Sequence, residues 1–170
     1  PGKLLAARIE ANVGSDKTYT TYGSVDELTI GVAVDGWMND ERAVKSSGIG
    51  GDAIIRFGGL SLLTEGRFNR LSPKEDLVVT PGVLAETKRQ GVMAQLGYSV
   101  DAFEPAFRFS TLDDDTNMED AGDASELLGG VTWHSDKDQV RAGLGYVSRL
   151  ETGGKVIPND TLRAWLQMRL

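Results

Sequence analysis

The chain has 170 residues, which is the usual length of one domain. Its 18 Lys and Arg residues against 25 Asp and Glu residues give a formal charge of −7, which excludes the overall basic surface of a nucleic-acid-binding protein. The absence of cysteine excludes disulfides, thiol nucleophiles and cysteine-ligated zinc. His134 is the one histidine of the sequence, so no metal site can use two histidines. We expect no metal and no cofactor.

Alternation of apolar and polar residues with a period of two predicts β-strands along the whole chain and no helix. In each predicted strand one parity holds no charged residue apart from Lys3 at the start of the first strand, whereas the other parity carries charges in eight of the nine strands. The nine predicted strands are residues 3–13, 27–35, 52–57, 60–69, 91–100, 105–112, 126–134, 139–149 and 162–170. The sequence therefore predicts an all-β, antiparallel fold in a single domain over residues 1–170.

The same alternation fits a soluble, half-buried sheet and a membrane-spanning β-barrel. The lengths of the connections between the strands help to distinguish these two folds. Tight turns are expected at residues 58–59, 99–103 and 135–138. Long polar connections are expected at residues 36–51, 70–90, 113–125 and 150–160. Outer-membrane barrels have short turns at one end and long loops at the other, which favours the barrel. Segment 14–26 departs from this pattern, because alternation assigns it to the short side.

Aromatic residues and glycines also favour a barrel. Phe57, Tyr98 and Trp133 each lie on the charge-free parity just before a tight turn, where an interfacial aromatic girdle would place them. A soluble core offers the competing interpretation, since aromatic residues also suit strand ends. Glycine is frequent on the charged parity, where a packed soluble face would lose contacts but a face lining water needs no side chain to fill it.

Five stretches of the sequence carry a resemblance to a known family. They are KLLAARIEANVGS (3–15), GGDAIIRFGGLSLLTEGRFNRL (50–71), GVMAQLGYSVDAFEPAFRFSTLDDD (91–115), ELLGGVTWHSDKDQVRAGLGYVSRL (126–150) and NDTLRAWLQMRL (159–170). In order and spacing they resemble the downstream strands and turns of the phosphate-selective porins O and P. The resemblance implies a sixteen-stranded transmembrane β-barrel in the bacterial outer membrane, a homotrimer that passes small anions such as phosphate.

The resemblance also implies that this chain is the C-terminal part of a larger barrel. Nine predicted strands are an odd number, whereas single-chain bacterial barrels have an even number. Leu170 departs from the family's habit of ending in an aromatic residue, although it keeps the charge-free parity of Leu162 and Leu166. We find no motif onto which the family's phosphate-site residues can be carried.

Arginines on the charged parity are the candidate pore-lining residues, because rings of Arg or Lys select anions and guanidinium matches phosphate geometry. They are Arg8, Arg56, Arg67, Arg108, Arg141, Arg149, Arg163 and Arg169. The competing interpretation is that these arginines pair with carboxylates and brace the wall, as the sequence suggests for Arg8 with Glu10, Asp52 with Arg56, and Glu65 with Arg67. The last five arginines have few acidic neighbours in sequence, so they are the better candidates for a basic stripe.

Two further features suggest other chemistry, and neither suffices. Asp113, Asp115 and Asn117 imitate the start of a calcium loop, but Met118 and Ala124 occupy the places where such a loop needs Gly and Glu. His134 with nearby serines suggests a hydrolase, but the chain contains no Gly-x-Ser-x-Gly elbow. We therefore expect no enzymatic activity.

The leading interpretation is a passive channel for small anionic solutes, in contact with outer-membrane lipid and lipopolysaccharide and with no nucleic-acid partner. A structural or interaction barrel within a larger envelope complex is the first alternative. A soluble β-sandwich that serves as a binding module is the second. Barrel strands look alike in the first two, whereas dependence of solubility on detergent separates both from the third.

Overall fold

The computed structural model describes residues 2–14, 23–41, 43–74, 86–118, 123–135, 139–151 and 159–168. Over these residues the fold is all-β, as predicted. The strands are β1 Lys3–Val13, β2 Val25–Asp40, β3 Val44–Gly58, β4 Leu60–Pro73, β5 Thr87–Tyr98, β6 Phe103–Asp113, β7 Ala124–His134, β8 Val140–Glu151 and β9 Thr161–Met168. None of the described residues forms a helix long and apolar enough to cross a membrane.

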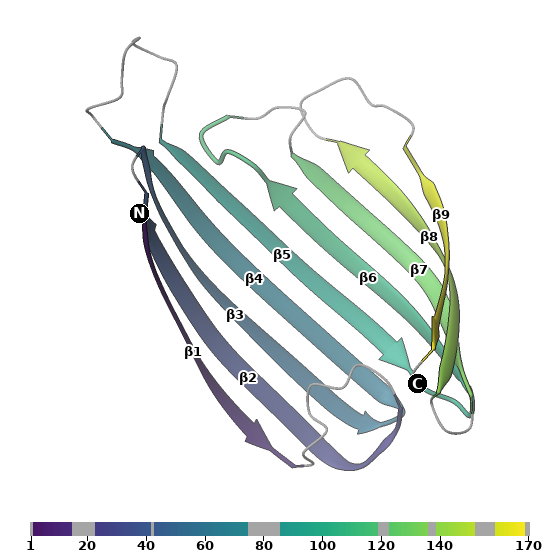
Figure 1. Ribbon diagram of the computed structural model, residues 1–170. Coiled ribbons are helices and arrows are strands. Elements are labelled where there is room, and N and C mark those ends of the chain that lie inside the picture. Colours follow the sequence, from purple (N-terminus) through teal and green to yellow (C-terminus); the bar gives the residue numbers. More distant parts are fainter. Residues whose placement is uncertain are drawn as a thin grey trace.

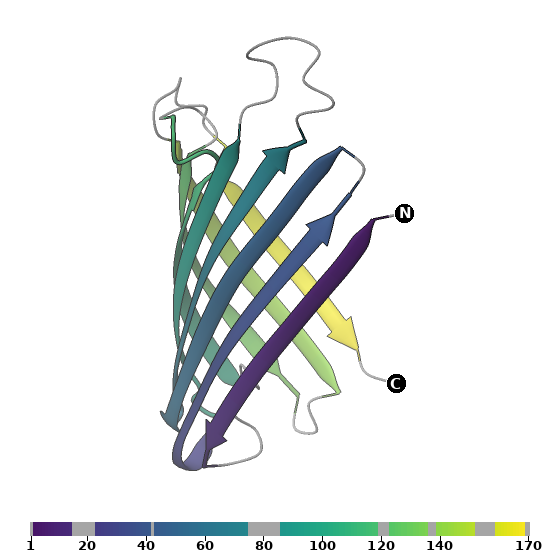
Figure 2. The ribbon, with the colours of Figure 1, turned by 90° about the vertical axis from the view of Figure 1, so that its left-hand side faces the viewer.

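All nine strands belong to one antiparallel sheet in chain order, each strand pairing with the one before it (Figure 1). The register is continuous across the sheet, apart from an irregularity between Val25 and Thr29 on β2. The sheet curves into an open trough, with β1 and β9 at its two edges (Figure 2). The sheet is not closed, since among the described residues β1 pairs only with β2 and β9 only with β8.

The strands β2 and β3 are longer than predicted, and this corrects the expected long connection at residues 36–51. β2 continues to Asp40 and β3 begins at Val44, so these strands are joined by residues 41–43. The sequence conceals this pairing because Gly and Ser dominate residues 46–51 and leave no apolar alternation to read. The other three long connections persist in shortened form, at residues 74–86, 114–123 and 152–160.

Two of the tight turns have the backbone that their residues require. Phe57 pairs with Leu60, which leaves Gly58 and Gly59 as a two-residue turn with a positive φ of 55° at Gly58. A Cβ on Gly59 would lie 2.2 Å from the carbonyl oxygen of Ser99, so the neighbouring turn packs directly against it. Asp101 has a positive φ of 51° in that second turn, which a bridge between Val100 and Phe103 closes.

The register assigns every residue of the sheet to one of two faces, since cross-strand partners share a face and neighbours along a strand alternate. One row across the sheet contains no charge. It comprises Ile9, Val34, Gly51, Gly66, Val92, Thr111, Ser125 and Leu150. The adjacent row on the opposite face contains Arg8, Asp35, Gly50, Arg67, Gly91 and Leu112. The sheet therefore has one apolar face and one charged face.

Candidate functional site

The charged face is the concave face of the trough. The carbonyl oxygen of Gly23 accepts a hydrogen bond from Arg56 on β3 at 2.5 Å, while its N–H donates to Glu104 on β6 at 3.3 Å and to Ser99 at 3.1 Å. In a flat sheet, a strand and its third neighbour, such as β3 and β6, lie about 14 Å from each other. One residue can reach both β3 and β6 only where the sheet curves around it, so Arg56 and Glu104 lie on the inner side.

Gly23 covers a small buried cluster at the short-turn end of this concave face. Arg56, Thr29 and Ile54 are almost fully buried, although they belong to a single-layered sheet. Burial of the Arg56 guanidinium is offset by its bond to the Gly23 carbonyl, since a buried charge without partners would be costly. Gly23, which precedes β2, therefore lies inside the trough.

An ion-pair network spans β1 to β4 on the concave face. Arg8 contacts Asp52 at 2.7 Å, with Asp35 and Glu10 each at 3.6 Å. Arg67 contacts Glu65 at 2.5 Å and Asp35 at 3.4 Å. Among the described residues, two guanidinium groups therefore share four carboxylates, and this network is acidic in balance. The predicted wall pairs of Arg8 with Glu10 and of Glu65 with Arg67 are present, whereas Asp52 pairs with Arg8 and Arg56 bonds to Gly23.

The arginines of β5 and β6 have neutral hydrogen-bond partners. Arg108 donates from Nε and Nη2 to the amide oxygen of Gln95, at 2.9 and 2.5 Å. Arg89 donates from Nε to the backbone carbonyl of Asp114 at 3.2 Å. A hollow with a volume of 630 Å³ lies over β4, β5 and β6 and is lined by Arg67, Arg89 and Arg108, with Glu65 and Asp114. Arg67 is paired with Glu65, whereas Arg89 and Arg108 are held in place by neutral oxygens, which suits an attractive surface for anions.

The remaining predicted arginines lie on β8 and β9. Arg149 forms an ion pair with Glu126, the residue directly opposite it on β7, so it is not part of an unneutralised stripe. Sequence proximity missed this pair because 23 residues separate the partners. Arg141 lies opposite His134, and Arg163 lies opposite Gly145 and is exposed. Arg169 lies outside the described residues.

Glycines on the concave face have a different role from the one expected. A Cβ on Gly143 would lie 2.3 Å from Nε1 of Trp165, and a Cβ on Gly48 would lie 2.4 Å from Nε1 of Trp37. Each glycine thus accommodates an indole from the facing strand. The expectation that glycines on this parity merely face water is wrong at Gly143, and Gly48 lies in β3 and not in the expected connection at residues 36–51.

His134 and Glu104 form a polar group next to the Gly23 cluster. His134 Nε2 lies 3.8 Å from Glu104 Oε2, and the same oxygen accepts a hydrogen bond from Ser99 Oγ at 3.0 Å. In a hydrolase triad the histidine stands between the serine and the carboxylate and removes the serine proton. Here the carboxylate stands between them, so Ser99, His134 and Glu104 are not arranged as such a triad.

The acidic run after β6 makes local hydrogen bonds. Asp115 Oδ1 accepts bonds from the backbone and side-chain nitrogens of Asn117, at 3.2 and 2.8 Å. Among the described residues no group of three His, Asp or Glu side chains is arranged to hold a metal ion.

Two carboxyl groups at strand ends have perturbed acidities. The hydrogen bond from Arg70 holds the pKa of Glu86 below its usual range, helped by the positive charges of Arg70 and Lys88. The hydroxyl of Tyr146, with the backbone N–H of Arg149, lowers the pKa of Asp160. Both carboxylates are therefore charged at neutral pH and fix the entries of β5 and β9.

The convex face is apolar and exposed across the sheet. Ile9 on β1 is 79 % exposed, Phe107 on β6 is 52 % exposed, and Leu166 on β9 is 65 % exposed. The predicted aromatic residues lie on this face at the short-turn end, namely Phe57, Tyr98 and Trp133, and all three are exposed. Phe103, which faces Trp133, joins them and was not singled out from the sequence.

No family model, curated protein or solved structure matches this chain.

Proposed function

We propose that the chain forms part of an outer-membrane porin, a β-barrel channel through which small anionic solutes diffuse passively. The observation that carries this proposal is the separation of the faces. Apolar side chains fill an exposed convex face from β1 to β9, while the concave face carries arginines and carboxylates. A soluble protein rarely leaves an apolar patch of this extent uncovered, whereas a barrel in lipid requires it.

The open edges of the sheet fit the same proposal. β1 and β9 are exposed along their whole lengths, and their outer backbone groups have no strand beside them among the described residues. In hydrocarbon such groups cost several kcal/mol each, so a membrane-spanning sheet has to close. Further strands, from a longer chain or from another copy, would complete the wall. Membership of the phosphate-selective porin family and a trimeric state belong to this proposal.

Anion preference is proposed from the arginines of the second half of the sheet. Arg89 and Arg108 are bound to neutral oxygens, and Arg163 extends the same face toward β9. Within a narrow aqueous lumen, the low-dielectric wall strengthens their field and raises the local anion concentration. The acidic balance of β1 to β4 opposes this effect, so the preference should be moderate.

A planar bilayer with a salt gradient tests both the channel and its selectivity. Replacement of Arg108, Arg141 and Arg163 by Gln should lower the anion-to-cation permeability ratio, most clearly at low salt because the Debye length is about 10 Å at 0.1 M. The matched control replaces Arg70 by Gln on the convex face and should leave the ratio unchanged. If the triple variant conducts with an unchanged anion-to-cation permeability ratio, the arginines only stabilise the wall and do not select anions.

A structural barrel within a larger envelope complex is the second candidate, and one observation favours it. The chain at Gly23 is fixed inside the trough by β3 and β6, where it occupies space that a wide channel would leave to water. Absence of conductance from protein that has inserted into the bilayer would favour this structural function over the porin.

A further inference from the structure

The convex face, which is uncharged through its middle, carries cations at one end. Lys3, Lys45, Arg70 and Lys88 all lie on the convex parity, near the ends of their strands, and Asp40 lies on the same face between Lys3 and Lys45. This is the end at which the connections at 74–86 and 114–123 lie. The opposite end carries the aromatic residues instead. A sheet face that repeats apolar residues for several rows and then presents cations has the layering of a lipid leaflet, hydrocarbon first and headgroup beyond it.

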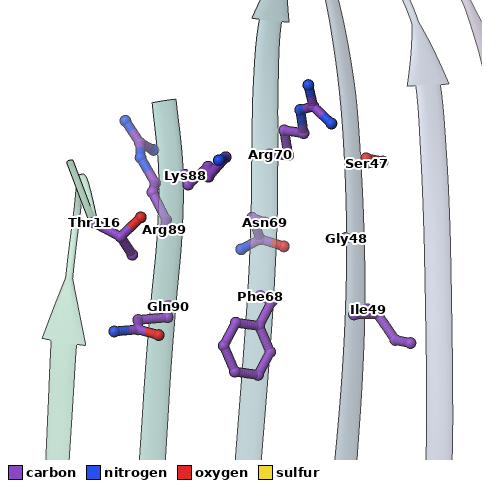
Figure 3. Close-up of a pocket in the computed structure, with 10 residues that line it drawn as sticks. All are labelled: Ser47, Gly48, Ile49, Phe68, Asn69, Arg70, Lys88, Arg89, Gln90 and Thr116. Atoms are coloured by element: carbon purple, nitrogen blue, oxygen red, sulfur yellow. The ribbon is translucent and has the colours of Figure 1, made fainter. Parts of the chain in front are cut away.

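Two of these cations border a hollow with a volume of 490 Å³ over β3, β4 and β5. Its lower part is apolar, with Ile49 and Phe68, and its upper part carries Arg70, Lys88 and Arg89 (Figure 3). Ser47, Gln90 and Thr116 add uncharged polar groups, and no carboxylate is among the residues that line the hollow. The Arg70 and Lys88 side chains are 59 % and 52 % exposed, so both can reach a ligand.

The nearest carboxylates are already engaged. Glu86 bonds to Arg70 and lies 3.7 Å from Lys88, and Asp113 accepts a hydrogen bond from Gln90 at 3.1 Å. Glu86 contacts Arg70 through one of the guanidinium nitrogens, Nη2. The other donors of Arg70 and the ammonium group of Lys88 can therefore bind an acceptor with several oxygens.

We propose that this hollow binds a phosphate-bearing lipid, with its phosphate held by Arg70 and Lys88 and an acyl chain lying on Phe68 and Ile49. The proposal rests on the proposed function, since it needs the convex face to lie in a membrane. Charge complementarity selects an anionic headgroup, and the apolar floor selects an amphiphile over free phosphate. The hollow lies at the end of the sheet with the long connections, and this position would place the lipid in the outer leaflet.

The test measures lipid binding to the full-length protein purified in a neutral detergent. Thermal unfolding is followed while lipid A, phosphatidylcholine or inorganic phosphate is titrated. Lipid A should raise the midpoint temperature, whereas phosphatidylcholine at the same concentration should not. Arg70→Gln with Lys88→Gln should weaken lipid A binding by about tenfold or more, since each cation near an anionic headgroup contributes about 1 kcal/mol.

The matched control is Lys3→Gln, which removes a convex cation of β1 at the same end that does not line this hollow, and which should leave lipid A binding intact. If the double variant fails to fold, Lys88→Gln alone replaces it in the test, and we expect it to weaken lipid A binding severalfold. Equal stabilisation by inorganic phosphate would show a free-phosphate site and overturn the proposal. Equal stabilisation by phosphatidylcholine would also overturn it. Conductance of the same variants in a neutral bilayer shows independently whether the channel itself is intact.

Discussion

Arg8 on β1 and Asp52 on β3 form an ion pair with 2.7 Å between Nη1 and Oδ2, although β2 lies between their strands. The pair bridges the concave face of a curved sheet and binds three strands together at one level. Arg8 Nη1 also lies 3.6 Å from Asp35 on the strand between them. The side chains therefore brace the wall near β1, which pairs with β2 alone among the described residues.

A double-mutant cycle should measure this brace. Arg8→Gln and Asp52→Asn should each destabilise the folded protein, and their coupling should lie between about 0.2 and 1 kcal/mol, because the Arg8 side chain is 39 % exposed. Urea unfolding in detergent micelles provides the free energies. The same cycle for Arg8 with Glu126, a residue of β7, should give no coupling. A coupling of zero for Arg8 with Asp52 would contradict the assigned brace.

Gly143 should not tolerate a methyl group. In Gly143→Ala the new Cβ would lie 2.3 Å from Nε1 of Trp165, so the indole has to move away from β8. We expect a loss of about 1–3 kcal/mol in the free energy of unfolding. Trp165 fluorescence should shift at the same time, measured with Trp37 and Trp133 replaced by Phe.

The control for this substitution is Gly129→Ala, where nothing lies within 4 Å of the added Cβ. It should leave both stability and fluorescence close to those of the parent protein. Equal behaviour of the two alanine variants would show that Trp165 does not lie over Gly143.

Arg56 should fix the chain at Gly23 to the inner wall. Arg56→Met removes the donor to the Gly23 carbonyl from a buried site, with an expected loss of about 2 kcal/mol. The Gly23 amide should then exchange its hydrogen faster, which mass spectrometry of the peptide detects. Arg163→Met, at an exposed position of β9, should change neither quantity. Unchanged exchange at Gly23 in Arg56→Met would refute the anchor.

Acid should weaken the junction between β8 and β9. Because the bonds from Tyr146 and Arg149 lower the pKa of Asp160 in the folded protein, its contribution to stability is fully present above its unfolded pKa, about 3.9, and is lost as the pH falls through the lowered folded value. Tyr146→Phe should flatten the pH dependence of unfolding below pH 4. An identical dependence in the variant and the parent protein would mean that this bond adds nothing to stability.

The sequence predicts the strands well where apolar residues alternate, and poorly where glycine and serine interrupt them. Alternation in Leu5 to Val13 identifies the face that the register confirms. By contrast, the glycines and serines that begin β3 conceal a paired strand, because they carry no information about facing. The register brings together residues that are far apart in the sequence, such as Arg149 and Glu126. Such pairs could not be predicted, because the distance between two residues on paired strands does not depend on their separation along the chain.

The position of Gly23, which precedes β2, also could not be predicted from the sequence. The length of segment 14–26 indicates only that it is not a tight turn. Curvature of the sheet decides that Gly23 meets Arg56 and Glu104, and curvature is a property of all nine strands together.

Residue-by-residue labelling along β5 tests the central claim, that the convex face contacts hydrocarbon and the concave face contacts water. The chain has no cysteine, so single cysteines can be placed at Val92, Met93, Ala94, Gln95 and Leu96 in protein reconstituted in vesicles. Spin labels on these cysteines then report collision with lipid-soluble oxygen or with a water-soluble nickel complex. The account predicts strict alternation, with positions 92, 94 and 96 accessible to oxygen and positions 93 and 95 accessible to nickel. Water accessibility at all five positions, or protection of the even positions from both reagents, would contradict it.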